Sequence, residues 1–193
     1  MKRGEYVGNS SDISGKVASQ SYMAEMHNDG LYFLEQAKKA TDEFLKRRFL
    51  RASIIYFCTS VEAAMCRIVS DKLVQIEHEL EQGDEYIELK NSLNDPNGTP
   101  PRFFRSIDGK IKVVEDIFGS KIPLSIKRPY KQLTFLRNKI IHYSNSYKSQ
   151  IYATGKVEKL AYGAPDVVDK FLSILFGYIN LSDGYYKNRT SRY

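Results

Sequence analysis

Residues 52–69 restrict the possible folds of this chain more than any other segment. Their sequence, ASIIYFCTSVEAAMCRIV, is an almost unbroken run of apolar and small side chains. The run forms the first half of a helix expected from about residue 49 to residue 80, and its second half, from residue 71 onward, is strongly charged. A helix that is apolar around its whole circumference has to be surrounded by other elements. We therefore expect the first half to run through the middle of a helical bundle and the second half to project into solvent.

Apolar residues recur at spacings of three and four in several other segments, and this spacing predicts amphipathic helices. The first expected helix has its apolar positions between Met23 and Leu45, with a possible break at 28–30. The others span residues 107–118, 129–147 and 166–181. The sum is an all-α chain, an antiparallel bundle of four to five helices.

Turn-forming residues mark two connections. The density of Asn, Asp, Pro and Gly within residues 91–105 predicts a loop. Gly155 and Lys156 separate two short apolar stretches, 151–154 and 157–162, and a small hairpin is possible there, before the last helix.

The distribution of polar residues suggests one helical domain over residues 21–182. Residues 1–20 are expected to be a flexible arm, and residues 183–193 a flexible basic tail. The arm lacks the apolar core of a signal peptide, and no apolar run approaches the roughly 20 residues that cross a bilayer. A cytoplasmic location is the expectation.

Charge and cysteine content exclude little. The formal net charge of +6 and the sequence pI of about 9.1 favour polyanionic partners, but they fit RNA, DNA, an anionic membrane or an acidic protein equally well. Cys58 and Cys66 lie eight residues apart on one expected helix, about 12 Å along its axis, so they cannot form a disulfide with each other. Reduced core thiols are the better interpretation. Two cysteines and three scattered histidines give no zinc-binding spacing, and we expect neither a metal nor a cofactor.

His142 is the histidine with candidate partners. His27 stands beside the possible helix break, and His78 lies in a charged stretch that suits a solvated surface. His142 follows Arg137 by five residues, which is about 140° around a helix, whereas Asn138 shares a face with His142. A flexible arginine could still curl toward the imidazole. On spacing alone, a surface pair or a hydrogen-bonded core histidine is the favoured interpretation.

The string 136–142, LRNKIIH, resembles the R-N-x-x-x-H signature of the HEPN superfamily. Residues 52–64 also resemble the apolar HEPN helix that carries an embedded acidic residue. In architecture the resemblance spans roughly residues 21–181. It implies paired antiparallel helices and a homodimer that brings two motifs together in a cleft. Many members are toxins or defence effectors that cut RNA without metal and leave a cyclic phosphate.

The resemblance thus predicts a metal-independent endoribonuclease of a toxin–antitoxin or antiviral defence system, acting on RNA and controlled by an antitoxin or another defence protein. Arg137 would stabilise the transition state, His142 would transfer the proton of the attacking 2′-hydroxyl, and Asn138 would shape the pair. Tyr143 follows the histidine directly, whereas toxins paired with nucleotidyltransferase antitoxins have tyrosine one position later, where this chain has Ser144. This departure argues against regulation by tyrosine modification.

Two other interpretations remain. Some HEPN domains are non-catalytic, so the chain could be a binding or adaptor module for nucleic acid, a nucleotide or a partner protein. A structural helical protein with a chance motif is the second.

Glu62 is the one carboxylate in the apolar run, and burial of a lone charge requires a partner. It could contact Arg137 or Asn138 behind the catalytic groups, or it could simply reach the edge of its helix. The residues do not favour one option over the other.

Basic residues near the motif in sequence are candidates for RNA binding. They are Lys131, Lys139, Arg128, Arg102 and Arg105. Phe103 and Phe104 could stack on unpaired bases, although anchoring of the loop is the favoured role.

Overall fold

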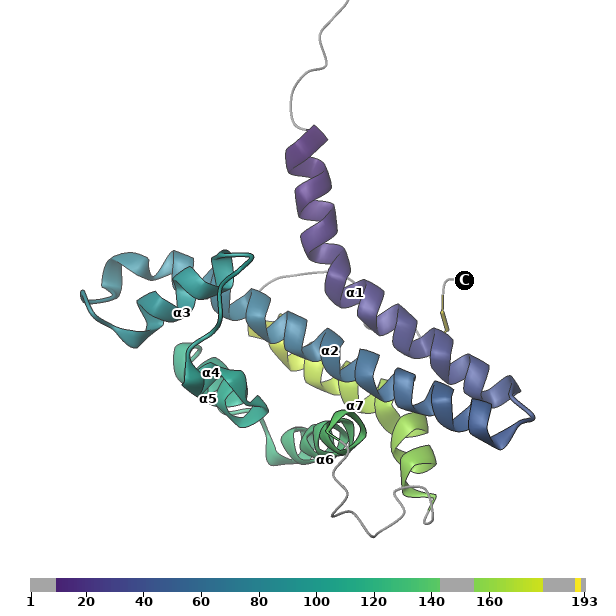
Figure 1. Ribbon diagram of the computed structural model, residues 1–193. Helices are drawn as coiled ribbons and strands as arrows, with labels where there is room; N and C mark the ends of the chain where they lie inside the picture. Colours follow the sequence, from purple (N-terminus) through teal and green to yellow (C-terminus); the bar gives the residue numbers. More distant parts are fainter. Residues whose placement is uncertain (1–9, 143–154, 179–189, 192–193) are drawn as a thin grey trace, which may run out of the picture.

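The computed structural model describes residues 10–142, 155–178 and 190–191, and within these ranges the chain is all-helical (Figure 1). The described residues form seven α-helices and one 3-10 turn, η1, and contain no strand. The bounds are α1 Ser10–Lys39, α2 Glu43–Gln75, η1 Glu77–Glu79, α3 Glu85–Asn94, α4 Arg102–Arg105, α5 Ile107–Ile117, α6 Leu124–Ile141 and α7 Lys156–Tyr178. The predicted all-α class is confirmed. The described residues hold more helices than the four to five expected, because the short helices α3 and α4 form in and beside the segment expected to be a loop.

Helix α2 is the centre of the molecule. It packs against α1, α3, α5, α6 and α7, and α6 in turn packs against α7 (Figure 1). Ile54, Phe57, Val61 and Met65 are completely buried, at spacings of three and four residues. The apolar run therefore lies at the middle of the bundle, as expected.

By length and composition alone, α2 is also long and apolar enough to cross a membrane, the only such helix among the described residues. Of its most apolar stretch, 56% is buried inside the protein. The central helix of a folded bundle meets the same criterion, so this is weak evidence for a membrane span.

The first two helices divide elsewhere than the apolar spacing indicated. Asp42 caps α2, and its carboxylate accepts a hydrogen bond of 2.7 Å from the backbone N–H of Leu45. Phe44 and Leu45 therefore belong to the start of α2, not to the first helix. A capping aspartate satisfies an orphan donor of the first turn and so fixes where a helix begins.

Helix α1 passes through residues 28–30 without a break, and it begins at Ser10, inside the segment expected to be an arm. A β-carbon added at Gly30 would lie 2.9 Å from the ring of Phe57, so the glycine allows α1 to approach α2 closely. A helix forms its hydrogen bonds internally, so it can extend beyond its packing partner. Residues 1–9 lie outside the described ranges.

The loop expected at 91–105 is shorter than predicted, because α3 ends at Asn94 and α4 begins at Arg102. Asp84 caps α3 by accepting a hydrogen bond of 2.8 Å from the backbone N–H of Tyr86. Leu89 of α3 is completely buried against the core.

The prediction of a hairpin is wrong at its second strand. Residues 157–162, which were expected to form that strand, belong to α7. Gly155, with a φ of 62°, precedes the helix directly. Val157, Ala161, Ala164 and Val168 are buried with a spacing of about 3.6 residues, so the apolar face of the last helix extends back past the glycine. Residues 151–154 lie outside the described ranges, as do residues 179–189 and 192–193, which include most of the tail expected at 183–193. Within that tail, Ser191 donates from its N–H and hydroxyl to the Glu35 carboxylate, at 2.7 Å each.

Candidate functional site

Three helices bring charged side chains together around Glu62, near the middle of α2. Arg137 of α6 donates from Nη2 to Glu62 Oε1, and Lys110 of α5 donates from Nζ to Glu62 Oε2 at 2.8 Å. The side chains of Glu62, Lys110 and Arg137 are 20%, 13% and 19% exposed, respectively. These three residues, the Glu62 cluster, therefore form a largely buried ionic network.

The sequence explains why Glu62 can lie in an apolar helix. Val61 is completely buried, whereas Ala63 packs only partly against the core, so Glu62 stands at the border of the buried face. Its carboxylate contacts Arg137, one of the two contacts that the sequence left open. The network keeps the carboxylate from being a lone buried charge.

Lys110 was missed by the sequence analysis. It is the fourth residue of α5, a helix capped by Ser106, whose hydroxyl accepts from the backbone N–H of Gly109 at 3.0 Å. Its ammonium also lies 5.9 Å from the ring centroid of Phe104. No local signal marks this lysine, because it meets Glu62 only through the packing of α5 on α2.

The Glu62 cluster carries one carboxylate and two cations, so an excess of positive charge remains. The Nε of Arg137 is buried and has no hydrogen-bond partner among the described residues. The cluster therefore retains both charge and a donor that Glu62 does not use.

Two buried titratable groups near the Glu62 cluster, Tyr130 and Cys58, are uncharged. Tyr130 is completely buried, donates to the backbone carbonyl of Cys58 at 3.4 Å, and packs against Phe171 with ring centroids 4.4 Å apart. Burial raises the pKa of Tyr130 well above its usual value and raises the pKa of Cys58 to about 12. Neither group is ionised near neutral pH, so the phenol and the thiol supply packing and not a nucleophile.

His142 and Asn138 lie on another side of α6. His142 is the C-terminal cap of the helix, and its backbone N–H donates to the carbonyl of Asn138 at 2.8 Å. Both side chains are exposed, while Arg137 turns inward to Glu62. Among the described residues, neither side chain is hydrogen-bonded to Arg137. Within a single copy of the protein, the Arg137 side chain therefore contacts Glu62 and not His142. Tyr143 and Ser144 lie outside the described ranges.

The five basic candidates fall into two groups. Lys131, Lys139 and Arg128 belong to α6, whereas Arg102 and Arg105 belong to α4. Lys131 pairs with Asp108 at 2.6 Å, and Lys139 Nζ lies 4.5 Å from the ring centroid of Phe135.

The two α4 arginines share a shallow depression of about 540 Å³ with Glu85 and Glu88. Phe104 is completely buried, and the half-buried Phe103 packs edge-on against Tyr86 with ring centroids 6.2 Å apart. Loop anchoring therefore describes this pair better than a stacking platform does.

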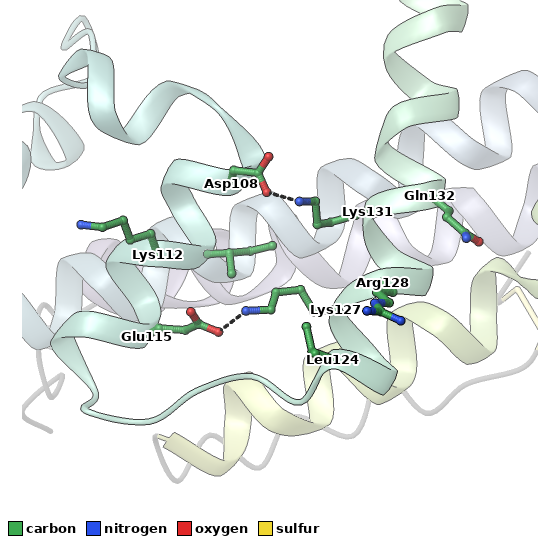
Figure 2. Close-up of a pocket in the computed structure, with 9 residues that line it drawn as sticks. Asp108, Lys112, Glu115, Leu124, Lys127, Arg128, Lys131 and Gln132 are labelled. Atoms are coloured by element: carbon green, nitrogen blue, oxygen red, sulfur yellow. Dashed lines mark hydrogen bonds and ion pairs between the residues drawn. The ribbon is translucent and has the colours of Figure 1, made fainter.

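A groove of about 490 Å³ separates α5 from α6 (Figure 2). Two ion pairs cross it, Lys131 with Asp108 and Lys127 with Glu115, both at 2.6 Å. Although burial raises the pKa of Glu115, hydrogen bonds from Lys127 and from the backbone N–H of Ile122 lower it more, and the net shift is downward. Most of the positive charge in the groove is thus neutralised within the protein.

Among the described residues, no group of three or more His, Cys, Asp or Glu side chains is arranged to hold a metal ion. Comparison with family models, with curated proteins and with solved structures finds no match to this chain.

Proposed function

We propose that the chain is a metal-independent endoribonuclease of the HEPN type, serving a toxin–antitoxin or antiviral defence system in the cytoplasm. The observation that carries the proposal is the ion pair between Glu62 and Arg137. It joins the two segments on which the resemblance to the HEPN superfamily rests, and they lie 75 residues apart in the sequence. A chance R-x-x-x-x-H string gives no reason for its arginine to meet the acidic residue of the apolar helix.

The proposed chemistry uses groups of ordinary protein side chains. The His142 imidazole accepts the proton of a 2′-hydroxyl, which attacks the adjacent phosphorus, and the leaving 5′-oxygen receives a proton as the bond breaks. Arg137 stabilises the charge on the phosphoryl oxygens, and the second cation of the Glu62 cluster prevents Glu62 from cancelling that charge. The products are a cyclic phosphate and a 5′-hydroxyl.

The geometry of one chain bears on how Arg137 and His142 could act together. Their five-residue spacing corresponds to about 140° around a helix, and the Arg137 side chain turns inward to Glu62. In the proposed enzyme, two copies of the chain form the site, so that His142 of one copy meets the cationic cluster of the other. Cleavage should therefore fall more steeply than in proportion when the protein is diluted below the dimer dissociation constant.

A test for cleavage uses the purified chain and mixed cellular RNA in EDTA. Wild type should cleave, and His142→Ala should lose about 10²-fold or more in rate, as expected for loss of a general base. His78→Ala is the matched control, because the His78 side chain is 77% exposed and should not affect the rate. Cleavage that requires a divalent metal, or that survives in His142→Ala, would contradict the proposal.

The second candidate function is a non-catalytic binding module. It is favoured by the inward orientation of Arg137, whose guanidinium contacts Glu62 and not the exposed His142. This alternative predicts RNA binding without cleavage by a folded wild type. It also predicts that Arg137→Lys lowers stability and leaves RNA affinity unchanged, because an ammonium replaces the guanidinium imperfectly in an ion pair.

A further inference from the structure

One cation of the groove between α5 and α6 is left without a counter-charge. Arg128 lines this groove and is exposed, and among the described residues its guanidinium makes no ion pair or hydrogen bond (Figure 2). The three lysines that line the groove, Lys112, Lys127 and Lys131, each pair with a carboxylate. Arg128 is therefore the groove cation that can bind an anionic group of a ligand without breaking a contact of the fold.

Two other side chains of α6 lie in line with Arg128. Leu124, which is 59% exposed, precedes it by four residues, and the exposed Gln132 follows it by four. On an α-helix this spacing keeps the three residues within about 80° of the circumference and over about 12 Å of its length. The Gln132 amide, like Arg128, makes no hydrogen bond with the described residues. Leu124, Arg128 and Gln132 are called the groove edge below.

The groove edge offers three kinds of contact, and a peptide can use all of them. A guanidinium binds a carboxylate through two parallel hydrogen bonds. An exposed leucine can be covered by an apolar side chain, and a primary amide can donate to and accept from peptide groups. A strand of nucleic acid fits less well, because Glu115 and the 67%-exposed Asp108 stand in the same groove and repel a row of phosphates.

We propose that the groove edge binds an acidic peptide segment of a partner protein. A carboxylate of the segment contacts Arg128, an apolar side chain covers Leu124, and the peptide backbone contacts Gln132. In an extended peptide, alternate side chains lie about 6.7 Å apart on one face. Leu124 and Arg128 are about 6 Å apart along α6. The expected ligand therefore carries an apolar residue and an acidic residue two positions apart.

The groove edge is separate from the residues of the proposed function. Arg128 precedes Arg137 by nine residues and His142 by 14, which is about 14 Å and about 21 Å along the axis of α6. A peptide on the groove edge therefore leaves both residues uncovered. The contact tethers the partner beside the proposed catalytic groups, and the rate of RNA cleavage should be the same with and without the peptide.

The test is a titration of the isotope-labelled chain with short synthetic peptides, followed by NMR. The probe is a glycine–serine peptide, blocked at both ends, with one leucine and one glutamate two positions apart. The comparison peptide has glutamine in place of the glutamate. The glutamate peptide should shift the backbone signals of the groove edge and bind with a dissociation constant on the order of 1 mM. The glutamine peptide should bind about tenfold more weakly, because it lacks the charged hydrogen-bond acceptor.

Substitution of Arg128 separates this contact from general attraction between charges. In Arg128→Gln, the two peptides should bind equally weakly, because the guanidinium is gone. Arg128→Lys keeps the charge but not the two parallel donors, so it should retain only part of the preference for glutamate. Arg48→Gln is the matched control, because Arg48 is an exposed arginine of α2, and the preference should be unchanged.

Any of three results would overturn the inference. They are the absence of a saturable shift with the glutamate peptide, equal affinities of wild type for the two peptides, and an Arg128→Gln protein that keeps the preference for glutamate. Displacement of the peptide from the groove edge by an uncleavable 2′-O-methyl RNA strand that binds more tightly would also overturn it, and would assign the groove to nucleic acid. Peptide binding of the expected kind by a chain that does not cleave RNA would contradict the proposed endoribonuclease and leave the groove edge intact.

Discussion

Replacement of Glu62 by glutamine should destabilise the fold more than loss of any single surface charge. The substitution keeps the volume of the side chain but leaves two cations, Lys110 and Arg137, facing each other with no counter-charge. Their side chains are 13% and 19% exposed, so water compensates them only in part.

The expected magnitude follows from the burial of the network. Removal of one partner from a fully buried ion pair costs about 3–5 kcal/mol, whereas loss of an exposed pair costs about 0–1 kcal/mol. Side chains that are about four-fifths buried lie between these limits, and we expect Glu62→Gln to lower the free energy of unfolding by about 2–3 kcal/mol. For a chain of this length the melting temperature should fall by about 5–10 °C.

The assay is urea unfolding followed by circular dichroism. Asp116→Asn is the control, because Asp116 pairs with the 76%-exposed Lys112 on the surface of α5, and the midpoint should not change. In the double variant Glu62→Gln with Lys110→Gln, the loss should be smaller than the sum of the single losses, because one of the two uncompensated cations is gone. A loss below about 1 kcal/mol for Glu62→Gln would refute the reasoning, because that is the value of a solvent-exposed pair.

Three further predictions concern packing, pH and thiol reactivity. Gly30→Val should lower the free energy of unfolding by about 2 kcal/mol, because the valine side chain would meet the buried Phe57 ring. Gly163→Ala should raise the free energy of unfolding by about 0.5–1 kcal/mol, because there is open space at its β-carbon. Thermal melts of both variants check these two expectations. Glu115 has a lowered pKa despite its burial, because of its hydrogen bonds, so its stabilising contribution is present above its usual value of 4.5 and is lost as the pH falls through the lower folded value. The midpoint of urea unfolding should thus depend less on pH in Glu115→Gln than in wild type between about pH 5 and pH 3, and equal dependence would contradict the assignment. Burial raises the pKa of Cys58 to about 12, so iodoacetamide at about pH 8 should modify it only after denaturant is added, as peptide mass spectrometry would show.

The local sequence determined the positions of those helices whose apolar residues recur at strongly periodic spacings. The apolar run at 52–69 requires neighbours on all sides, and α2 is indeed central. The helix expected at 107–118 is α5, Ile107–Ile117. Ser106, the residue before it, caps its N-terminus. The angular separation of Arg137 and His142 also followed from helix geometry alone, because it depends only on the number of residues between them.

Local signals were misleading where a packing partner changed their meaning. Gly30 is a turn former in sequence, yet in the structure it lets α1 approach Phe57, a contact that lies 27 positions away in the chain. In sequence, Gly155 fits the turn of a hairpin, whereas in the structure it precedes a helix whose buried face begins at Val157. In each case the backbone preference of glycine is real, and the structure uses it for a purpose that its neighbours in sequence do not reveal.

The composition of the candidate site was decided by tertiary structure. The sequence identified Glu62 as a carboxylate in need of a partner and Arg137 as one possible partner. A single charged residue in an otherwise apolar helix is costly to bury unless another group pairs with it. It could not identify Lys110, since no rule of spacing relates residues 48 positions apart on different helices. Charge partners across a bundle are fixed by the positions of whole helices, and those positions follow from the packing of all their apolar faces together.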